Sequence, residues 1–178
     1  DAEYTLTNTI TSFNSDGYTI LNNAAVNNSG ETYVGWSWRG SDSTAVSNTD
    51  GTITSQVSAN PTAGFSVVTY SGSNTDGTVG HGLGVVPNMI IVKRTNSGTD
   101  GWQTYHSSLG NTGLLYLNST QAVVTGVGTW QSTTPTTTKF YLEISSGGVN
   151  ASGGTYVAYC FADVEGYSKF GSYTGNGS

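Results

Sequence analysis

The sequence has few charges and a single cysteine, and each shortage excludes a class of protein. Charged residues make up 9% of the 178 residues, and the formal net charge is −6. The five basic residues are dispersed, and an acidic protein repels a phosphate backbone, so we expect no nucleic-acid partner. Cys160 has no second cysteine with which to form an intrachain disulfide or a zinc cluster. Its position in an apolar stretch predicts a small, buried core residue.

Long hydrophobic runs and helical patterns are also missing. The longest apolar stretches, such as Met89–Val92, are far shorter than the roughly 20 residues that span a bilayer, so we expect no membrane insertion. Windows with apolar residues at helical spacing are interrupted by Gly, Pro or clustered Ser and Thr. Because the chain begins with Asp1 and not Met, we interpret it as a processed product or a piece of a longer protein.

Short strand patterns, in contrast, run along the whole chain. Hydrophobic residues make up 35% of it, and 25 glycines punctuate the apolar stretches. This pattern predicts an all-β fold, an antiparallel β-sandwich or jelly-roll-like structure with tandem-repeat character. The expected strands are Tyr4–Ile10, Tyr18–Leu21, Thr32–Trp38, Thr52–Val57, Phe65–Tyr70, Met89–Arg94, Trp102–His106, Gly113–Leu117, Lys139–Ile144, Thr155–Ala162 and Lys169–Tyr173.

Asp-Gly pairs are the most frequent turn signal. They occur at Asp16, Asp50, Asp76 and Asp100, and we expect each glycine to supply the positive backbone angle of a tight hairpin. Two pairs lie in an identical hexapeptide, SNTDGT, at 47–52 and 73–78. Calcium needs six to eight oxygen ligands, and each hexapeptide has one carboxylate. A turn accounts for these loops, so no metal site is predicted, although calcium binding stays open.

One thirteen-residue stretch occurs twice. VNNSGETYVGWSW at Val26–Trp38 returns as VNASGGTYVAYCF at Val149–Phe161, 123 positions later. Alternation gives each strand a bulky face and a small face, and we expect the bulky face to fill the core. The predicted sheet core comprises Val34, Trp36, Trp38, Phe65, Val67, Ile91, Phe140, Val157, Tyr159 and Phe161.

Weaker matches surround both copies. An aromatic strand precedes each, at Gly17–Leu21 and Phe140–Ile144, and a segment that begins with Phe and ends in Tyr-x-Gly follows, at Phe65–Gly72 and Phe170–Gly175. We therefore divide the chain into four parts: the back part of a β repeat (1–45), a linker or hairpin (46–63), a complete β-sandwich repeat (64–165) and the first strand of a following repeat (166–178). The chain is then a window from a tandem array, out of register with its repeats.

Three stretches carry a family resemblance: VSANPTAGFSVVTYSGSNTDGTVGHGLGVVPNMIIVKR at 57–94, WQTYHSSLG at 102–110 and TYVAYCFADVEGYSKFGSYTGNGS at 155–178. They resemble a repeat of structural proteins from tailed bacteriophages, particularly those of marine bacteria and cyanobacteria. The resemblance implies a non-enzymatic virion structural module of a tail fibre or host-attachment appendage, in the virion or outside the cell. Its implied partners are further copies, as a trimer or fibre, other virion proteins and a host surface glycan. No cofactor is implied.

Catalytic motifs are weak, so we predict no enzyme and no catalytic residue. GHGLG at 80–84 has the glycines of a phosphate loop but no Lys, and a strand follows it where a helix is needed, which favours a strand-entry turn with His81 bonded to backbone. His106 lies beside Ser107, but no G-x-S-x-G elbow accompanies them. Asp163 and Glu165 form the one close carboxylate pair; they favour a solubilised strand end, with Lys169 as an ion-pair partner, over a glycosidase pair.

Aromatic residues near loops give the one candidate ligand site. Trp102, Tyr105 and Trp130 stand beside Asn, Gln and hydroxyl side chains, a setting in which rings stack on sugars. The alternative is that they cap the ends of the sandwich. Two rival functions therefore stay open: a secreted or virion-borne carbohydrate-binding module, and a polysaccharide depolymerase that uses Asp163 and Glu165.

The predicted repeat boundaries leave strand edges without partners at both ends of the chain. Unpaired edges invite pairing with another chain. Either the two end fragments complete each other within one chain, or neighbouring copies supply the missing strands. We favour the second alternative, assembly into a homo-oligomer or fibre.

Overall fold

The computed structural model describes residues 6–126, 128–144 and 147–177, and its internal contacts define two units, Tyr4–Trp38 and Arg39–Ser178. The fold is all-β with antiparallel sheets, so the predicted fold class is confirmed. Over the described ranges, no helix has the length and apolar character that crossing a membrane requires.

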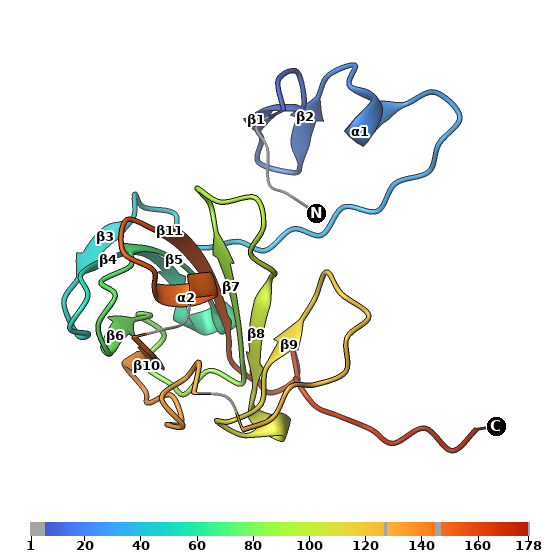
Figure 1. Cartoon of the computed structure of the whole chain (residues 1–178). Helices are drawn as coiled ribbons and strands as arrows, with labels where there is room; N and C mark the ends of the chain where they lie inside the picture. The colour runs from blue at the N-terminus through green and yellow to red at the C-terminus, as the bar shows by residue number, and fades with distance from the viewer. Residues whose placement is uncertain (1–5, 127, 145–146, 178) are drawn as a thin grey trace. The chain divides into compact units, whose positions relative to one another are not determined.

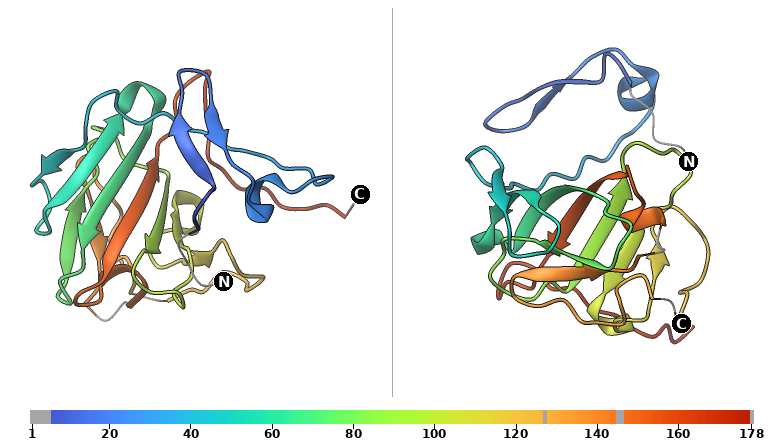
Figure 2. Two further views of the ribbon diagram at one scale, coloured as in Figure 1. Left: turned by 90° about the horizontal axis from the view of Figure 1, so that it is seen from above. Right: turned by 60° about the vertical axis from the view of Figure 1, so that its left-hand side comes forward.

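The larger unit is built on a seven-stranded sheet, shown in Figure 1. Strand β11 lies at its centre and pairs with β5 and β7, and Figure 2 shows these strands side by side. The order across the sheet is β3 (Val46–Asn48), β4 (Ser55–Asn60), β5 (Phe65–Ser71), β11 (Thr155–Phe161), β7 (Met89–Arg94), β8 (Gln103–His106) and β9 (Leu115–Tyr116).

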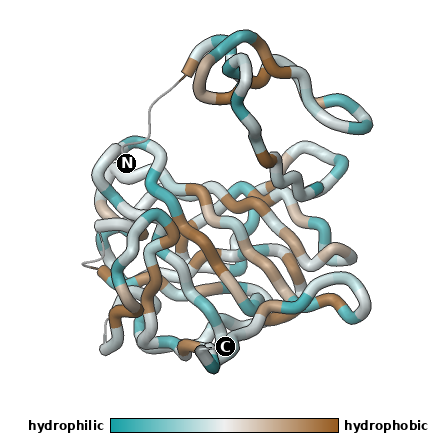
Figure 3. The backbone as a smooth tube through the Cα atoms, turned by 90° about the vertical axis from the view of Figure 1, so that its right-hand side faces the viewer, coloured by the Kyte–Doolittle hydropathy of each residue, from teal (hydrophilic) through white to brown (hydrophobic). Residues whose placement is uncertain are grey.

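A smaller layer covers one face of this sheet. It consists of the antiparallel pair β6 (Gly77–Gly80) and β10 (Lys139–Leu142), the short helix α2 (Gly147–Asn150) and the loops between β9 and β10. Two 3₁₀ turns follow strands of the large sheet, η1 (Pro61–Ala63) after β4 and η2 (Ser107–Leu109) after β8. The hydrophobic stretches in Figure 3 follow the strands. The core between the layers contains Val57, Val68, Tyr70, Val79, Ile90, Val92, Tyr105, Leu114, Trp130, Phe140, Leu142, Val149, Tyr156, Ala158 and Cys160.

The smaller unit contains one hairpin, one helical turn and an extended segment. Strands β1 (Ile10–Phe13) and β2 (Tyr18–Ile20) pair antiparallel, and helix α1 (Ala24–Asn27) follows them. Residues 31–38 belong to no strand, so the predicted strand Thr32–Trp38 is wrong. The start of the predicted strand Tyr4–Ile10 lies outside the described residues, and of the rest only Ile10 is in a strand.

The predicted core is wrong in both copies of the repeated stretch. Val34, Trp36 and Trp38 are 77, 74 and 50% exposed. In β11 the faces are reversed, because Tyr156, Ala158 and Cys160 point into the core, while Val157 and Tyr159 are half-buried on the other face. The physical reason is volume: rings from neighbouring elements and the ring of Tyr156 fill much of the core, so the rest of the strand places the small side chains of Ala158 and Cys160 there.

Of the remaining residues predicted for the core, one lies in the core and the others lie on the outer face of the sheet. Phe140 is fully buried in the core, as predicted. Phe65 and Phe161 are buried too, but they pack on each other, ring centroids 5.0 Å apart, on the outer face of the sheet. Val67 and Ile91 are half-buried on that outer face. These four side chains thus cover the outer face of the sheet, whereas other rings, such as those of Tyr70, Tyr105 and Trp130, fill the space between the layers.

Three of the Asp-Gly pairs, at Asp16, Asp50 and Asp100, lie in loops between paired strands, whereas Gly77 is the first residue of β6. None of the four glycines has a positive φ. Three of them are needed because a neighbour lies where a Cβ would stand; at Gly51 the Thr78 carbonyl carbon would be only 2.6 Å away. The repeated hexapeptides meet there: the N–H of Thr52 donates to Oγ1 of Thr78, and the N–H of Thr78 donates to Oγ1 of Thr52, both at 2.9 Å.

Other predicted boundaries also change. The linker or hairpin 46–63 is a hairpin, because it supplies β3 and β4 to the large sheet. Strand β6 was missed, since its sequence GTVG is half glycine. The predicted strand Lys169–Tyr173 is not formed, and residues 169–177 are assigned to no helix or strand.

Candidate functional site

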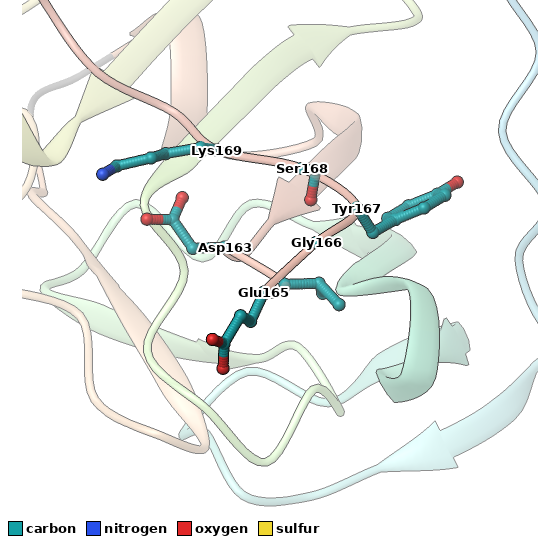
Figure 4. A pocket seen from close by; sticks show the side chains of 7 residues that line it. Asp163, Glu165, Gly166, Tyr167, Ser168 and Lys169 are labelled. Atoms are coloured by element: carbon teal, nitrogen blue, oxygen red, sulfur yellow. The ribbon is translucent and has the colours of Figure 1, made fainter.

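One pocket of the larger unit is lined by the consecutive residues Asp163–Lys169, shown in Figure 4. It encloses about 540 Å³ and is open to solvent. The carboxylates of Asp163 and Glu165 point in different directions in Figure 4. Asp163 accepts a hydrogen bond from the Phe170 N–H at 2.9 Å, and the Val164–Ser168 bridge closes the loop. Asp163 therefore helps to close the loop, and its own N–H donates to Oδ1 of Asn88, just before β7, at 2.9 Å.

His81 is fully buried at the entry to the smaller layer, where its ring is bonded to backbone as predicted. Its Nδ1 accepts the N–H of Leu83 at 3.2 Å, so its Nε2 carries the proton and donates to the Thr136 carbonyl at 3.1 Å. Burial lowers the pKa of His81, which the Thr136 bond and the charge of Asp50 only partly oppose. The neutral ring thus fastens the GHGLG turn to the loop before β10.

His106 and Ser107 stand at a helix end. His106 precedes η2, and its Nδ1 accepts the N–H of Ser108 at 3.1 Å. Ser107 is exposed as the first residue of η2. Nδ1 of His106 thus accepts a backbone hydrogen bond and does not bond to the Ser107 hydroxyl.

The predicted sugar-binding rings do not form one surface. Tyr105 and Trp130 are each 2% exposed and meet edge to face in the core, with centroids 6.0 Å apart. The Trp130 indole N–H donates to the Gly113 carbonyl. Trp102 is half-buried on the outer face of the sheet, where it stacks on Tyr159 at 6.5 Å. The proposed platform is therefore wrong for Tyr105 and Trp130, because buried rings offer no face to a sugar.

Cys160 is fully buried, as predicted. Burial raises the pKa of its thiol to about 12, which the Ser66 hydroxyl lowers only in part. Within the described ranges, no three His, Cys, Asp or Glu side chains are grouped to hold a metal ion.

The two copies of the thirteen-residue stretch share their local structure in detail. Helix α1 and helix α2 occupy the same positions of the stretch, 123 residues apart. In the first copy the Tyr33 hydroxyl donates to the Ala24 carbonyl (3.0 Å) and accepts the Asn28 N–H (2.9 Å). In the second, the Tyr156 hydroxyl makes the equivalent bonds to Gly147 and Ala151, both at 2.8 Å.

The turn between helix and strand is the same as well. Gly30 and Gly153 both have a positive φ, 84° and 68°, which favours glycine at these positions. The Glu31 N–H donates to the Asn28 carbonyl, and the Gly154 N–H donates to the Ala151 carbonyl. Sequence reasoning identified the shared part but missed its helix, because one helical turn leaves no periodicity in the sequence.

The copies differ in what surrounds them. β11 has a strand on each side, whereas no strand of the described residues pairs with 31–37. Asn150 is fully buried, and its side chain binds the Ser73 N–H and the Thr75 carbonyl. Its counterpart Asn27 is exposed. The first copy therefore presents to solvent the groups that the second copy uses to hold β5, and these groups form the candidate interaction site.

No curated protein and no solved structure matches the chain. The model of one family, described as a domain of unknown function (DUF7483), matches residues 1–178. The chain therefore belongs to this family of domains of unknown function.

Proposed function

We propose that this protein is a non-enzymatic structural module of a tailed-bacteriophage particle, within a tail fibre or another host-attachment appendage. The main observation in support of a structural role is that one copy of the repeated stretch, Val26–Trp38, is exposed. It presents Val34, Trp36 and Trp38 next to a backbone that is paired in the other copy. Contiguous exposed apolar side chains mark interaction sites on soluble proteins, and an unpaired extended backbone marks strand pairing.

The phage setting rests on the sequence resemblance of 57–94, 102–110 and 155–178 described above. A structural role also agrees with the chemistry of the larger unit. Its titratable side chains bind backbone groups: His81 holds Leu83 and Thr136, and Asp163 holds Phe170. The buried His81 and the exposed Asp163 thus stabilise the scaffold through hydrogen bonds to backbone.

Purified phage particles whose genome encodes this sequence test the proposal. Mass spectrometry is expected to find peptides of this chain at a constant ratio to the major capsid protein, and antibodies against the recombinant chain should label the tail appendage in electron micrographs. Peptides in the cell lysate but not in the particles would overturn the proposal. Release of reducing sugar from host polysaccharide, lost in Asp163→Asn or Glu165→Gln, would replace it with the depolymerase.

A further inference from the structure

The larger unit shows how the repeated stretch holds the end of a β5-type strand. The ring of Tyr70, at the end of β5, stacks on Tyr156 with centroids 5.1 Å apart, and its hydroxyl donates to the Val149 carbonyl at 2.8 Å. Burial raises the pKa of Tyr70 well above its usual value, so this donor proton is retained. Beyond Tyr70, the Gly72 N–H donates to the Gly154 carbonyl.

The corresponding groups exist in the smaller unit, where Asn27, Glu31 and Tyr33 are exposed and Val26 is half-buried. The counterparts of Val149, Asn150, Gly154 and Tyr156 are Val26, Asn27, Glu31 and Tyr33, which we call the Tyr33 site. Tyr33 is already positioned by the two hydroxyl bonds that Tyr156 makes, and it is 51% exposed. The site is therefore preformed, and its ring and backbone face solvent.

The chain also contains a second copy of the segment that such a site receives. Tyr70-Ser71-Gly72-Ser73-Asn74 corresponds to Tyr173-Thr174-Gly175-Asn176-Gly177. Asn74 and Gly177, the last residues of the two segments, both have a positive φ, 54° and 75°. Tyr173 is 95% exposed, whereas Tyr70 is 5% exposed.

In both segments a phenylalanine precedes the tyrosine, and the two side chains have the same relation to the faces of an extended strand. Phe65 lies five residues before Tyr70, and Phe170 lies three residues before Tyr173. Both spacings are odd, so in an extended strand Phe and Tyr point to opposite faces in each segment. Phe170 already contacts Phe161, with ring centroids 5.5 Å apart, so the start of the segment is anchored on β11.

We propose that residues 173–177 of one copy dock on the Tyr33 site of a second copy. Tyr173 then stacks on Tyr33 and donates to the Val26 carbonyl, and residues 170–174 pair antiparallel with 32–36. The occupant is a second copy because the chain itself provides the matching segment together with the site. Such a head-to-tail contact repeats, so it generates an open fibre or a closed ring. The inference rests on the proposed structural function and names the partner that the exposed strand requires.

Sedimentation velocity of the full chain over a range of concentrations tests the contact. The wild-type chain is expected to associate with rising concentration, and Tyr173→Ala should weaken association at least tenfold. Tyr167→Ala is the matched control, because Tyr167 is also exposed (68%) but lies outside the docking segment. A wild-type chain that stays monomeric at every concentration, or a Tyr173→Ala chain that associates like wild type, would overturn the proposal.

Mixing of two variants tests the head-to-tail geometry. Tyr173→Ala keeps the site and loses the tail, whereas Tyr33→Ala keeps the tail and loses the site. Each variant alone should be monomeric, and an equimolar mixture should form dimers that grow no further. Mixtures that remain monomeric while the wild type associates would show that another surface makes the contact.

Cysteine cross-linking tests the register and the choice of partner. Ser71 pairs with Thr155 in the large sheet, and their counterparts are Thr174 and Thr32. A Thr174→Cys copy mixed with a Thr32→Cys copy should form a disulfide-linked dimer under mild oxidation, since the native Cys160 is buried. A Ser43→Cys copy mixed with Thr174→Cys is the control. If the mixture fails to cross-link and the double variant forms a disulfide within one chain, the partner is not a second copy.

The two proposals fail separately. Labelled particles together with a chain that never associates would leave the virion role intact and remove the docking contact. If association depends on Tyr173 but the protein is absent from purified particles, the docking contact stands and the virion role falls.

Discussion

The two copies of one thirteen-residue stretch share a helix, a turn and a set of hydrogen bonds, yet they differ in their strands. At 149–161 the stretch runs into β11, the central strand of the large sheet, whereas at 26–38 the same pattern ends in an extended segment outside any strand. The shared part is local, because the partners in each bond lie at most nine residues apart. A strand depends on distant partners, since β11 pairs with β5 some 90 residues earlier. The comparison thus separates what neighbours in sequence determine from what neighbours in space add.

The largest expected contrast is between the two tyrosines. Tyr156 is buried and stacks on Tyr70, so Tyr156→Ala should lower the free energy of unfolding of the larger unit by about 3–5 kcal/mol, the usual cost of deleting a large buried ring. Tyr33→Ala should change it by less than about 0.5 kcal/mol, as expected for a half-exposed residue outside that unit. Urea unfolding followed by near-ultraviolet circular dichroism measures both. Equal effects of the two substitutions would contradict the burial of Tyr156 in the larger unit and the exposure of Tyr33 outside it.

The next contrast is between the two asparagines. Asn150→Ala removes the partners of the Ser73 N–H and the Thr75 carbonyl, and leaving such groups unsatisfied costs about 1–3 kcal/mol. Asn27 is exposed, so Asn27→Ala should leave the stability of the larger unit within about 0.5 kcal/mol of wild type. The same denaturation experiment applies. A tolerated Asn150→Ala would mean that water replaces the lost side chain.

Acid should destabilise the larger unit, because the buried His81 lies in it. Burial lowers the pKa of His81 below its ordinary 6.5. The unfolded chain therefore binds a proton at a pH where the folded chain does not, and the stability present above pH 6.5 is lost as the pH falls through the folded pKa.

Urea midpoints measured between pH 8 and 5 report this loss. We expect a flat midpoint above about pH 6.5 and a decline below it, before carboxylates begin to titrate. His81→Gln should be less stable at pH 8 and should lack most of the decline. A midpoint that falls equally in the variant would assign the pH dependence to another group.

The smallest expected effect concerns Trp36. Because it is 74% exposed, Trp36→Ala should change the free energy of unfolding by less than about 0.5 kcal/mol at concentrations low enough to keep the chain monomeric. Acrylamide should quench the fluorescence of Trp36 readily and that of Trp130 poorly, which single-tryptophan variants would measure. A protected Trp36 in dilute solution would place that side chain in a core and restore the face assignment predicted from the sequence.

Much of the fold follows from the sequence. The alternation in Met89–Arg94 and Thr155–Phe161 predicts strands, and the structure has them at those residues. Burial of Cys160 and the backbone bonds of His81 were also predicted from the short apolar and glycine-rich contexts of these residues. These features are local, since a strand pattern or a tight turn is encoded by the residues within it.

The facing of β11 and the fate of the aromatic rings were decided by tertiary structure. Alternation alone states that Val157 and Tyr159 share a face, but not which face is inside. That choice depends on the rings of Tyr70, Tyr105 and Trp130, which come from distant parts of the chain and pack with Tyr156, Ala158 and Cys160 in the core. The prediction placed Tyr105 and Trp130 in a surface site for the same reason, because the neighbouring sequence does not show that these rings are buried.

What the sequence by itself determined is the β class, the turn positions and the presence of one structural part in two copies. Only the tertiary structure decided that one copy is a buried central strand and the other an exposed segment with a preformed tyrosine. The physical reason is that the hydrogen bonds of a helical turn or a tyrosine cap close within a few residues, whereas a strand completes its bonds and buries its side chains only against strands that the rest of the chain, or another chain, brings beside it.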